Sequence, residues 1–235
     1  MALSENCSNM NEKTPQISRL FLILSSLFVV CLIAANLFET KQFSFFGYSQ
    51  PGGLIIFPVS YIINDVVCEV WGFRRARMLI WLGFLMNFFF VMMGTLCDIL
   101  PPAAYWENNE GFHAVFGLAP RITAASFVAF LGGSWVNAYV MSTMKVRHKG
   151  RFFPLRAIVS SLFGESIDSV IFFPLALGGI VPWKDLLWLM LLQVLLKTLY
   201  EVIIMPITAF VVKKVKAAEQ TDVYDQNIRY HLFKG

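Results

Sequence analysis

The stretch Phe57–Arg77, FPVSYIINDVVCEVWGFRRAR, decides the fold because it places acidic residues inside an apolar run. Asp65 and Glu69 lie in that run, which ends at a turn rich in arginine. A charge at the centre of a membrane helix costs roughly 2.5 to 3.5 kcal/mol even on the lenient insertion scale. Such side chains usually face a bundle interior or a water-filled cavity, so the stretch predicts a polytopic membrane protein with a polar central site.

The composition of the whole chain also indicates a membrane protein. Hydrophobic residues make up 57% of the chain and charged residues only 14%, whereas soluble proteins carry about 25% charged residues. Apolar runs near the roughly 20 residues that a spanning helix needs recur along the chain. We therefore predict an all-α integral membrane protein with six transmembrane helices. The predicted spans are Leu20–Phe38, Gly53–Val70, Arg77–Leu100, Ile122–Met144, Leu155–Ile180 and Trp183–Val212.

These spans divide the chain into an N-terminal tail (1–19), a six-helix domain (20–212) and a C-terminal tail (213–235). Fifteen of the 19 Lys and Arg residues lie in the two tails, the second-to-third loop and the fourth-to-fifth loop. Only three lie in the opposite loops, and Lys197 lies inside a span. By the positive-inside rule, both termini are expected in the cytoplasm and the protein in the inner (cytoplasmic) membrane. The same distribution explains the net charge of +4, so no direct contact with nucleic acid is expected.

The two halves of the chain carry similar polar residues in equivalent spans. Three helices in each half would give the halves opposite orientations in the membrane, the inverted-repeat plan of many transporters. Chance placement of common residues is the alternative. The matching residues are Asn36 and Asn137, the pairs Asp65/Glu69 and Glu165/Asp168, and Pro58 and Pro174.

Helical spacing places the remaining candidates on three polar faces. Side chains three or four residues apart share one face of a helix. We expect the three faces to converge inside the bundle, because the alternative places charges among lipid chains. The faces carry Tyr61, Asp65 and Glu69 on the second span, Glu165 and Asp168 on the fifth, and Lys197, Tyr200 and Glu201 on the sixth.

Some of these candidates have a structural alternative. Glu69 lies close to the end of its span, where it would pair with Arg74 or Arg77. Lys197 and Glu201 would neutralise each other as a pair four residues apart.

Depth in the membrane separates the other candidates. Asn36 and Asn137 would either bridge helices by hydrogen bonds or complete a ligand site. Lys197 is the one deep cation for several acids, so some of these are protonated or await a ligand rich in donors or positive charge. The acids concerned are Asp65, Glu165 and Asp168.

Two blocks resemble the queuosine precursor transporter family, also described as vitamin uptake type transporters. They are Phe57–Arg77, quoted above, and Leu155–Phe173, LRAIVSSLFGESIDSVIFF. The likeness extends over most of the six spans, although we expect many members to have a neutral amide in place of Glu165. The resemblance implies a transporter, not an enzyme, that needs no cofactor and imports a 7-deazaguanine base for tRNA modification. The base would be 7-cyano- or 7-aminomethyl-7-deazaguanine, or queuine.

The candidate residues fit this implied ligand. A guanine-like edge offers adjacent N–H donors that one carboxylate accepts in bidentate fashion, and its carbonyl needs an Asn or Lys donor. An aromatic ring would stack on the flat base. In this interpretation Asp65 and Asp168 bind the donor edge, with Asn36 or Asn137 completing it. Lys197 meets the carbonyl or balances charge and Glu201 orients Lys197, while Phe57, Tyr61, Trp135 or Tyr200 supplies the aromatic face.

Three other functions remain open from the sequence. The first is import of another small vitamin-like heterocycle, and the second is a scaffold in which the charges only pair helices. The third is an intramembrane enzyme with paired carboxylates, although the acids are mixed Asp and Glu and no Asp-Asp motif suits a shared-proton dyad. The bilayer is the expected environment, while a homo-oligomer, a coupling ion and an energising partner chain are left open.

Overall fold

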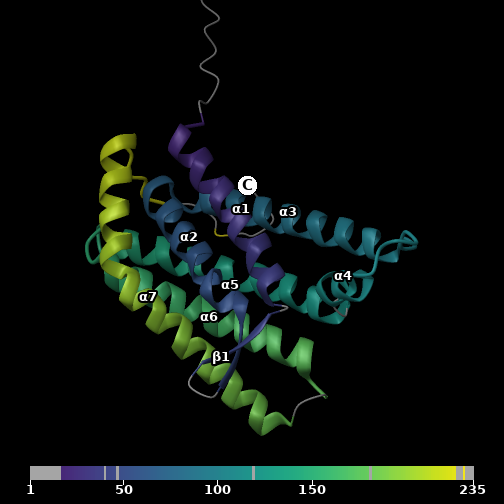
Figure 1. The fold of residues 1–235 in the computed structure, drawn as a ribbon. Helices are drawn as coiled ribbons and strands as arrows, with labels where there is room; N and C mark the ends of the chain where they lie inside the picture. Colours follow the sequence, from purple (N-terminus) through teal and green to yellow (C-terminus); the bar gives the residue numbers. More distant parts are fainter. Residues whose placement is uncertain are drawn as a thin grey trace, which may run out of the picture.

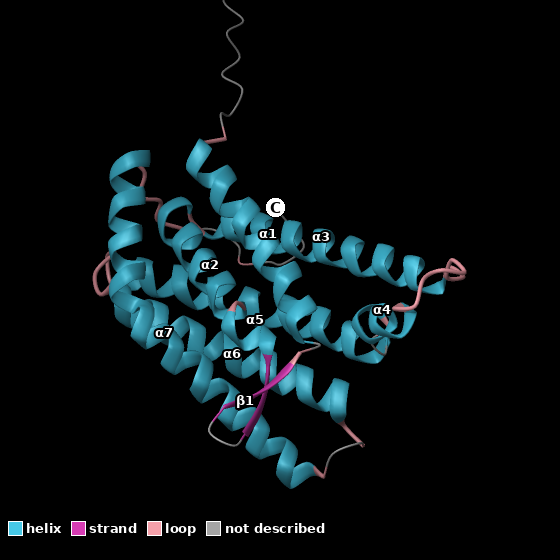
Figure 2. Cartoon of the chain, in the orientation of Figure 1, coloured by secondary structure: helices cyan, strands magenta, loops and turns pink. Residues whose placement is uncertain are grey.

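The computed structural model describes residues 17–39, 41–45, 48–117, 120–179, 182–225 and 230. Six of its helices are long and apolar enough to cross a membrane, so the prediction of an all-α protein with six spans is confirmed (Figures 1 and 2). Most of the predicted N-terminal tail lies outside the described residues. The elements are α1 (Arg19–Glu39), β1 (Gln42–Phe45), β2 (Tyr48–Pro51), a 3-10 turn η1 (Gly52–Ile55), α2 (Phe57–Trp71), α3 (Phe73–Ile99), α4 (Asn109–Phe116), α5 (Pro120–Arg147), α6 (Phe153–Leu177) and α7 (Trp183–Glu219).

The structure adds short elements to the predicted spans. Strands β1 and β2 pair as an antiparallel hairpin between α1 and η1 (Figure 2). The linker after α3 contains α4, which packs on α3 with the rings of Phe90 and Phe116 5.8 Å apart. Helix α7 continues past the predicted end at Val212 to Glu219. Pro58 lies within the second span, in the first turn of α2 after η1, a position where its missing N–H costs nothing.

Helix α2 is the most buried span. In its apolar 18-residue stretch 67% of the residues are buried, against 22% in the corresponding stretch of α3. It contacts α1, α3, α5 and α7 and lies among them in Figure 1. Gly72 ends it with φ of +83°, in the left-handed region that a glycine adopts without strain. The acidic stretch of the sequence is therefore held inside the bundle.

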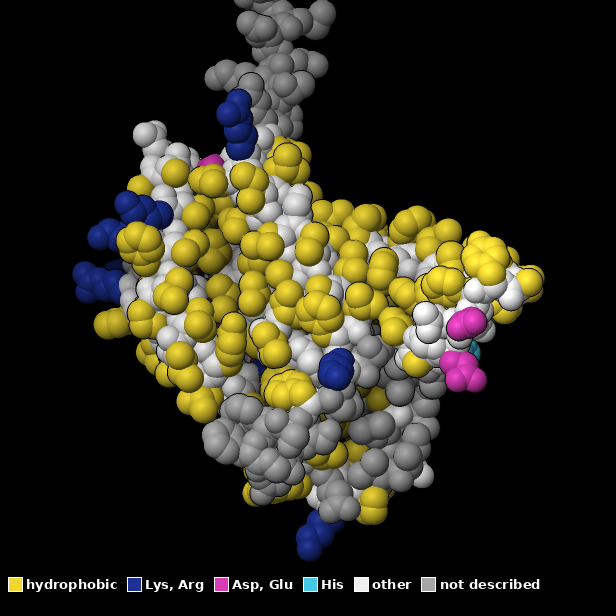
Figure 3. Space-filling model, in the orientation of Figure 1, with side chains coloured by type: hydrophobic (Ala, Val, Ile, Leu, Met, Phe, Trp, Pro, Cys, Tyr) yellow, Lys and Arg dark blue, Asp and Glu magenta, His cyan; other side chains and the backbone are white. Residues whose placement is uncertain are grey.

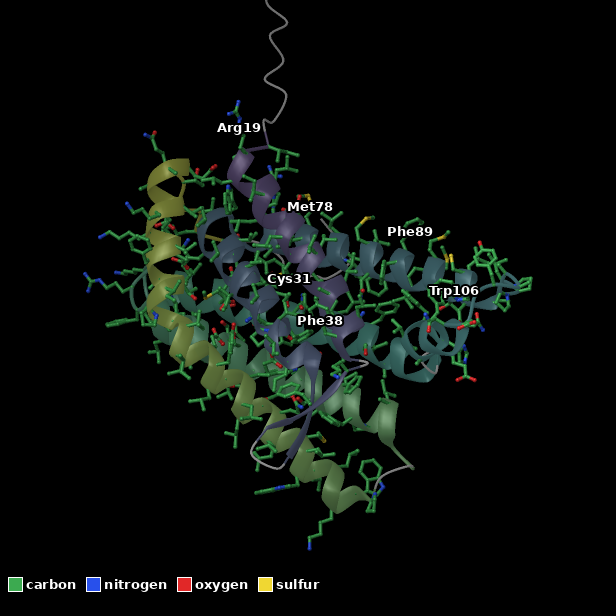
Figure 4. The ribbon with its side chains drawn as sticks, viewed as in Figure 1. Arg19, Cys31, Phe38, Met78, Phe89 and Trp106 are labelled. Carbon is green, nitrogen blue, oxygen red and sulfur yellow. The ribbon has the colours of Figure 1, made fainter. Side chains whose placement is uncertain are left out.

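The outward faces of the other helices are apolar. Hydrophobic side chains cover most of the face shown in Figure 3. Met78 and Phe89, labelled on α3 in Figure 4, are 43% and 55% exposed. Large contiguous apolar surfaces are unusual in soluble monomers, so this surface suits contact with lipid.

Helices α5 and α6 form the most extensive helix pair of the bundle. A Cβ atom added at Gly133 would lie 2.6 Å from the Tyr61 hydroxyl and 2.9 Å from the Gly164 carbonyl oxygen. A Cβ atom at Gly164 would lie 2.9 Å from the Cβ of Asn137. Small residues allow this close approach of two backbones, and the contact holds Tyr61 and Asn137 against α6.

The chain after α7 folds back against one end of the bundle. Val223 N–H donates to the Val70 carbonyl oxygen at 3.1 Å, and Asp225 accepts from Phe73 N–H at 2.8 Å and from the Ser142 hydroxyl. The segment Thr221–Asp225 thus ties α2, α3 and α5 together. The end of the bundle that this segment contacts carries the α2–α3 turn, the α5–α6 turn and the end of α7. We call it the basic end.

Replacing Gly133 with alanine is expected to destabilise the protein. The new methyl group overpacks the α5–α6 contact, which costs about 1 to 3 kcal/mol. Thermal unfolding of the purified protein in detergent measures the loss. Gly111→Ala is the control, because nothing lies within 4 Å of a Cβ atom there. An equal melting temperature for Gly133→Ala and the wild type would contradict the close packing.

Candidate functional site

Lys197 forms the centre of a buried ionic group between α6 and α7. Its Nζ atom lies 2.9 Å from Glu165 Oε2 and 3.6 Å from Asp168 Oδ2. The Nζ atom also lies 4.3 Å from the ring centroid of Phe57 on α2. We call Lys197, Glu165 and Asp168 the Lys197 cluster. Glu165 lies near the middle of α6, so the cluster lies deep in the bundle, where the sequence places it.

Asp65 and Glu201 form a second acidic group, between α2 and α7. Asp65 is 0% exposed and Glu201 is 4% exposed. Their carboxyl groups lie within hydrogen-bonding reach of each other, and Glu201 also lies within reach of the Ser161 hydroxyl. Neither Asp65 oxygen receives a hydrogen bond of ordinary geometry from a described residue. The sequence predicted no such pair, because its members come from helices that are far apart along the chain.

An amide network joins the second group to three helices. The Asn64 side-chain amide on α2 donates to Asn137 Oδ1 on α5 at 2.8 Å. Asn137 Nδ2 in turn donates to Ser161 Oγ on α6 at 3.3 Å. Asn137 therefore bridges helices, one of its two predicted roles, and also lies beside Asp65. Asn64 was not among the predicted site residues, although it directly precedes Asp65.

Several buried polar atoms around these groups lack a hydrogen-bond partner among the described residues. They include Asn64 Oδ1 and Ser169 Oγ, and Tyr61 Oη has only Ser134 within reach and no hydrogen bond of ordinary geometry to a described residue. Tyr61 faces Glu165 and Asp168, and its ring lies 5.5 Å from that of Phe57. Buried polar atoms are normally paired. Donors, acceptors and aromatic rings together therefore suit a planar polar ligand.

Glu69 belongs to a different cluster, at the basic end. Its carboxylate lies 2.6 Å and 3.0 Å from the two terminal nitrogens of Arg156 and 2.6 Å from Lys216 Nζ. Lys145 Nζ lies 3.9 Å away. These partners come from α6, α7 and α5, whereas the sequence suggested Arg74 or Arg77. With so many cations around it, Glu69 is better explained as an anchor than as a ligand residue.

Lys145 and Arg156 are the residues that sequence reasoning missed. Both were counted as loop residues that set topology, but they are 2% and 0% exposed. Lys145 also contacts Asp222 at 2.5 Å and the Val223 carbonyl oxygen at 2.7 Å. The available signal was the position of each residue beside a helix end. Nothing in the sequence said which of the many basic residues would meet Glu69.

Two predicted site residues lie outside these groups. Asn36 Nδ2 donates to Asn87 Oδ1 at 2.9 Å, which joins α1 to α3 and supports its helix-bridging alternative. Tyr200 is half-buried on α7, directly before Glu201.

Removing the Arg156 guanidinium is expected to destabilise the protein. The substitution removes the two charge-assisted hydrogen bonds that Arg156 donates to Glu69, each worth about 1.5 to 3 kcal/mol, while Lys216 and Lys145 still neutralise the Glu69 charge. Arg156→Gln should therefore lower the melting temperature strongly. Lys216→Gln is the matched control; this lysine contacts the same carboxylate but its side chain is 24% exposed, so it should cost less. Arg156→Gln and Glu69→Gln together should cost less than the sum of the two single losses, because both remove the same contact, and additive losses would contradict the pairing.

Asp222 gives this end of the bundle an acid-sensitive contact. Partial burial opposes its ionisation, but hydrogen bonds from Lys145 and Lys216 outweigh that effect and lower the pKa of Asp222 below its ordinary value of 3.8. Its stabilising contribution is complete above the ordinary value and is lost as the pH falls through the lower folded value. The difference in melting temperature between wild type and Asp222→Asn should therefore shrink in acid. A difference that grows in acid would contradict this assignment.

The chain matches a family model described as "Putative vitamin uptake transporter" over residues 51–211. It is also 29% identical over 185 residues to a Bacillus subtilis (strain 168) protein named "Probable queuosine precursor transporter". That match covers 77% of this chain and 80% of the relative. No solved structure matches the chain. Because the family match spans more than half of the chain and the six apolar helices agree with it, the protein belongs to the vitamin uptake transporter family and is a multi-pass membrane transporter, not an enzyme.

Proposed function

We propose that the protein imports a queuosine precursor, a 7-deazaguanine base, into the cytoplasm. The Lys197 cluster is the observation that carries this proposal, because it places acceptors and a donor deep inside a transporter bundle. The name of the Bacillus subtilis relative supports the class of substrate. Both sequence blocks that resemble the family lie on helices that build the site, α2 and α6.

The base would bind at the Lys197 cluster. Asp168 is 8% exposed and Glu165 is 2% exposed, whereas Asp65 is 0% exposed. Asp168 is therefore the most accessible acid for the adjacent N–H donors of the base, and a carboxylate accepts two such donors at once. Lys197 would donate to the base carbonyl. Asp65 and Glu201 face each other, so we assign Asp65 no contact with the base, in contrast to the interpretation from the sequence.

Aromatic residues complete the proposed pocket. Phe57 and Tyr61 lie against the Lys197 cluster, and either ring would stack on a flat heterocycle. The Tyr61 hydroxyl, which lies beside Asp168 and makes no hydrogen bond of ordinary geometry to a described residue, and Ser169 Oγ offer further hydrogen bonds. A polar planar base would satisfy these atoms, while an apolar ligand would leave them unpaired.

The basic end would face the cytoplasm. Most of the described Lys and Arg residues lie there, in the α2–α3 turn, the α5–α6 turn and the end of α7, and such residues are retained on the cytoplasmic side of the inner membrane. Import then requires the Lys197 cluster to open alternately to the outer side and to the basic end.

Replacing Asp168 with asparagine is expected to weaken import. Loss of one charge-assisted bidentate contact costs about 1.5 to 3 kcal/mol, or roughly 10- to 100-fold in affinity. Uptake of labelled 7-cyano-7-deazaguanine by cells that cannot synthesise 7-deazaguanines measures the effect as a raised KM. Ser166→Ala on the same helix is the control, because its exposed hydroxyl bonds only to the Leu162 carbonyl. Wild-type KM for Asp168→Asn would remove Asp168 from the site.

The family description favours one second candidate, import of another small vitamin-like heterocycle. The architecture would be the same and the cargo different. Competition of labelled uptake by 7-deazaguanines, vitamins and nucleobases separates the two. Competition by a vitamin alone would replace the deazaguanine proposal.

A further inference from the structure

The deep part of the bundle holds more acids than cations. Within the described residues, Lys197 is the only cation at the depth of the acids, and it already contacts two of them. The other buried cations lie at the basic end, around Glu69. Isolated buried charges are strongly disfavoured, so the deep acids cannot all be ionised. These acids are Asp65, Glu165, Asp168 and Glu201.

Asp65 and Glu201 are the two deep acids outside the Lys197 cluster. Their carboxyl groups face each other within hydrogen-bonding reach. Asn137 and Ser161 also lie within reach of them, but neither Asp65 oxygen nor Glu201 Oε1 receives a hydrogen bond of ordinary geometry from a described residue. Two carboxylates at such a separation in a low-dielectric site cannot both ionise and share one proton instead. A proton between them is the hydrogen-bond donor that the pair lacks.

The side chain of Asn64, close to the Asp65 and Glu201 pair, supports the same conclusion. Asn64 is 1% exposed, and its amide faces Asn137, which lies beside Asp65. Asn64 Oδ1 has no hydrogen-bond partner among the described residues. An unsatisfied acceptor at this point favours a protonated pair over two ionised carboxylates.

Each helix around the pair contributes known groups. The charged residues of the neighbouring α1 and α3 lie near the ends of these helices, namely Arg19, Glu39, Arg74, Arg75, Arg77 and Asp98. The groups close to the pair are Tyr61, Asn64 and Glu69 on α2, Asn137 on α5, and Ser161 and Glu165 on α6. Lys197 and Asp168 belong to the cluster that Glu165 shares.

We propose that Asp65 and Glu201 together bind one exchangeable proton, and that this proton enters the cell with the base. The coupling rests on the proposed function, whereas proton binding by the pair does not. With the proton bound, Lys197 stays with Glu165 and Asp168, as in the structure, and the base site is assembled.

Loss of the proton would disrupt the Lys197 contacts that form the base site. Glu201 lies four residues after Lys197, on the same face of α7. Once ionised, it competes with Glu165 and Asp168 for the Lys197 ammonium group. Base and proton therefore favour each other's binding, and this linkage is reciprocal. They bind together on the outer side and leave together at the cytoplasmic side, which makes the protein a proton symporter.

Infrared spectroscopy of the purified protein in lipid tests the proton site without any base. At neutral pH the wild type should show the carbonyl stretch of a protonated carboxylic acid. Asp65→Asn and Glu201→Gln should each lose it, because the new amide donates the hydrogen bond that the proton supplied. Asp98→Asn is the control, since Asp98 instead pairs with His113 at 2.6 Å. Absence of the band in the wild type, or its retention in both variants, overturns the proton site.

Proteoliposomes test the coupling with labelled 7-cyano-7-deazaguanine. For one proton per base, and with the membrane potential held at zero because the step carries one positive charge, a gradient of one pH unit, acid outside, should drive about tenfold accumulation by the wild type. Asp65→Asn and Glu201→Gln should still exchange labelled for unlabelled base but should not accumulate it, while Asp98→Asn behaves as wild type. Accumulation that follows a sodium gradient, ignores the pH gradient or persists in both variants overturns the coupling.

The two arms separate the possible failures. If the wild type exchanges none of the deazaguanines, the proposed function is wrong, and the infrared result still decides the proton site. If it exchanges the base but a pH gradient drives no accumulation, the coupling is wrong and the proposed function stands.

Discussion

Neutralisation of buried charge is the constraint on which this structure depends. In a bundle surrounded by lipid, an ionised group without a partner is far more costly than in water. Each acid in the interior therefore requires a cation, a hydrogen-bond donor or a proton. The way in which these requirements are met differs between the basic end and the middle of the bundle, and that difference separates anchoring from binding.

At the basic end, three cations surround the carboxylate of Glu69. Arg156 binds it with two nitrogens, and Lys216 and Lys145 add charge from two more helices. Together with Asp222 on the chain after α7, the cluster links α2, α5, α6 and α7. Such pairing rigidifies the helix ends and leaves no charge for a ligand. The cluster therefore holds the helices together.

In the middle of the bundle the balance is reversed. One lysine serves Glu165 and Asp168, and the neighbouring pair Asp65 and Glu201 has no cation of its own. Unpartnered hydroxyl and amide atoms lie around them. A site that is incomplete without added hydrogen-bond partners suits transport, because a cargo that satisfies these atoms binds there through hydrogen bonds that can also be exchanged with water on release.

Much of this arrangement was predictable from periodicity and charge. Tyr61, Asp65 and Glu69 lie four residues apart, so they had to share a face, and the cost of lipid contact required that face to point inward. Their division between two clusters was not predictable. It depends on helix depth and on which distant helix end lies opposite, as the partners of Glu69 show. The hairpin β1–β2 was missed because its short strands lie in a segment without a clear alternating pattern, and the inverted repeat stays a prediction.

The sequence by itself determined the class of protein, its six spans and the need for a buried polar site, because hydrophobic length and intramembrane charge are local properties. It also determined the family, through the blocks on α2 and α6. Only the tertiary structure decided which charges meet: Lys197 with Glu165 and Asp168, Glu69 with Arg156, and Asp65 with Glu201. The physical reason is that pairing depends on distance, and the close contact of α5 and α6 at Gly133 and Gly164 sets distances that no local pattern encodes.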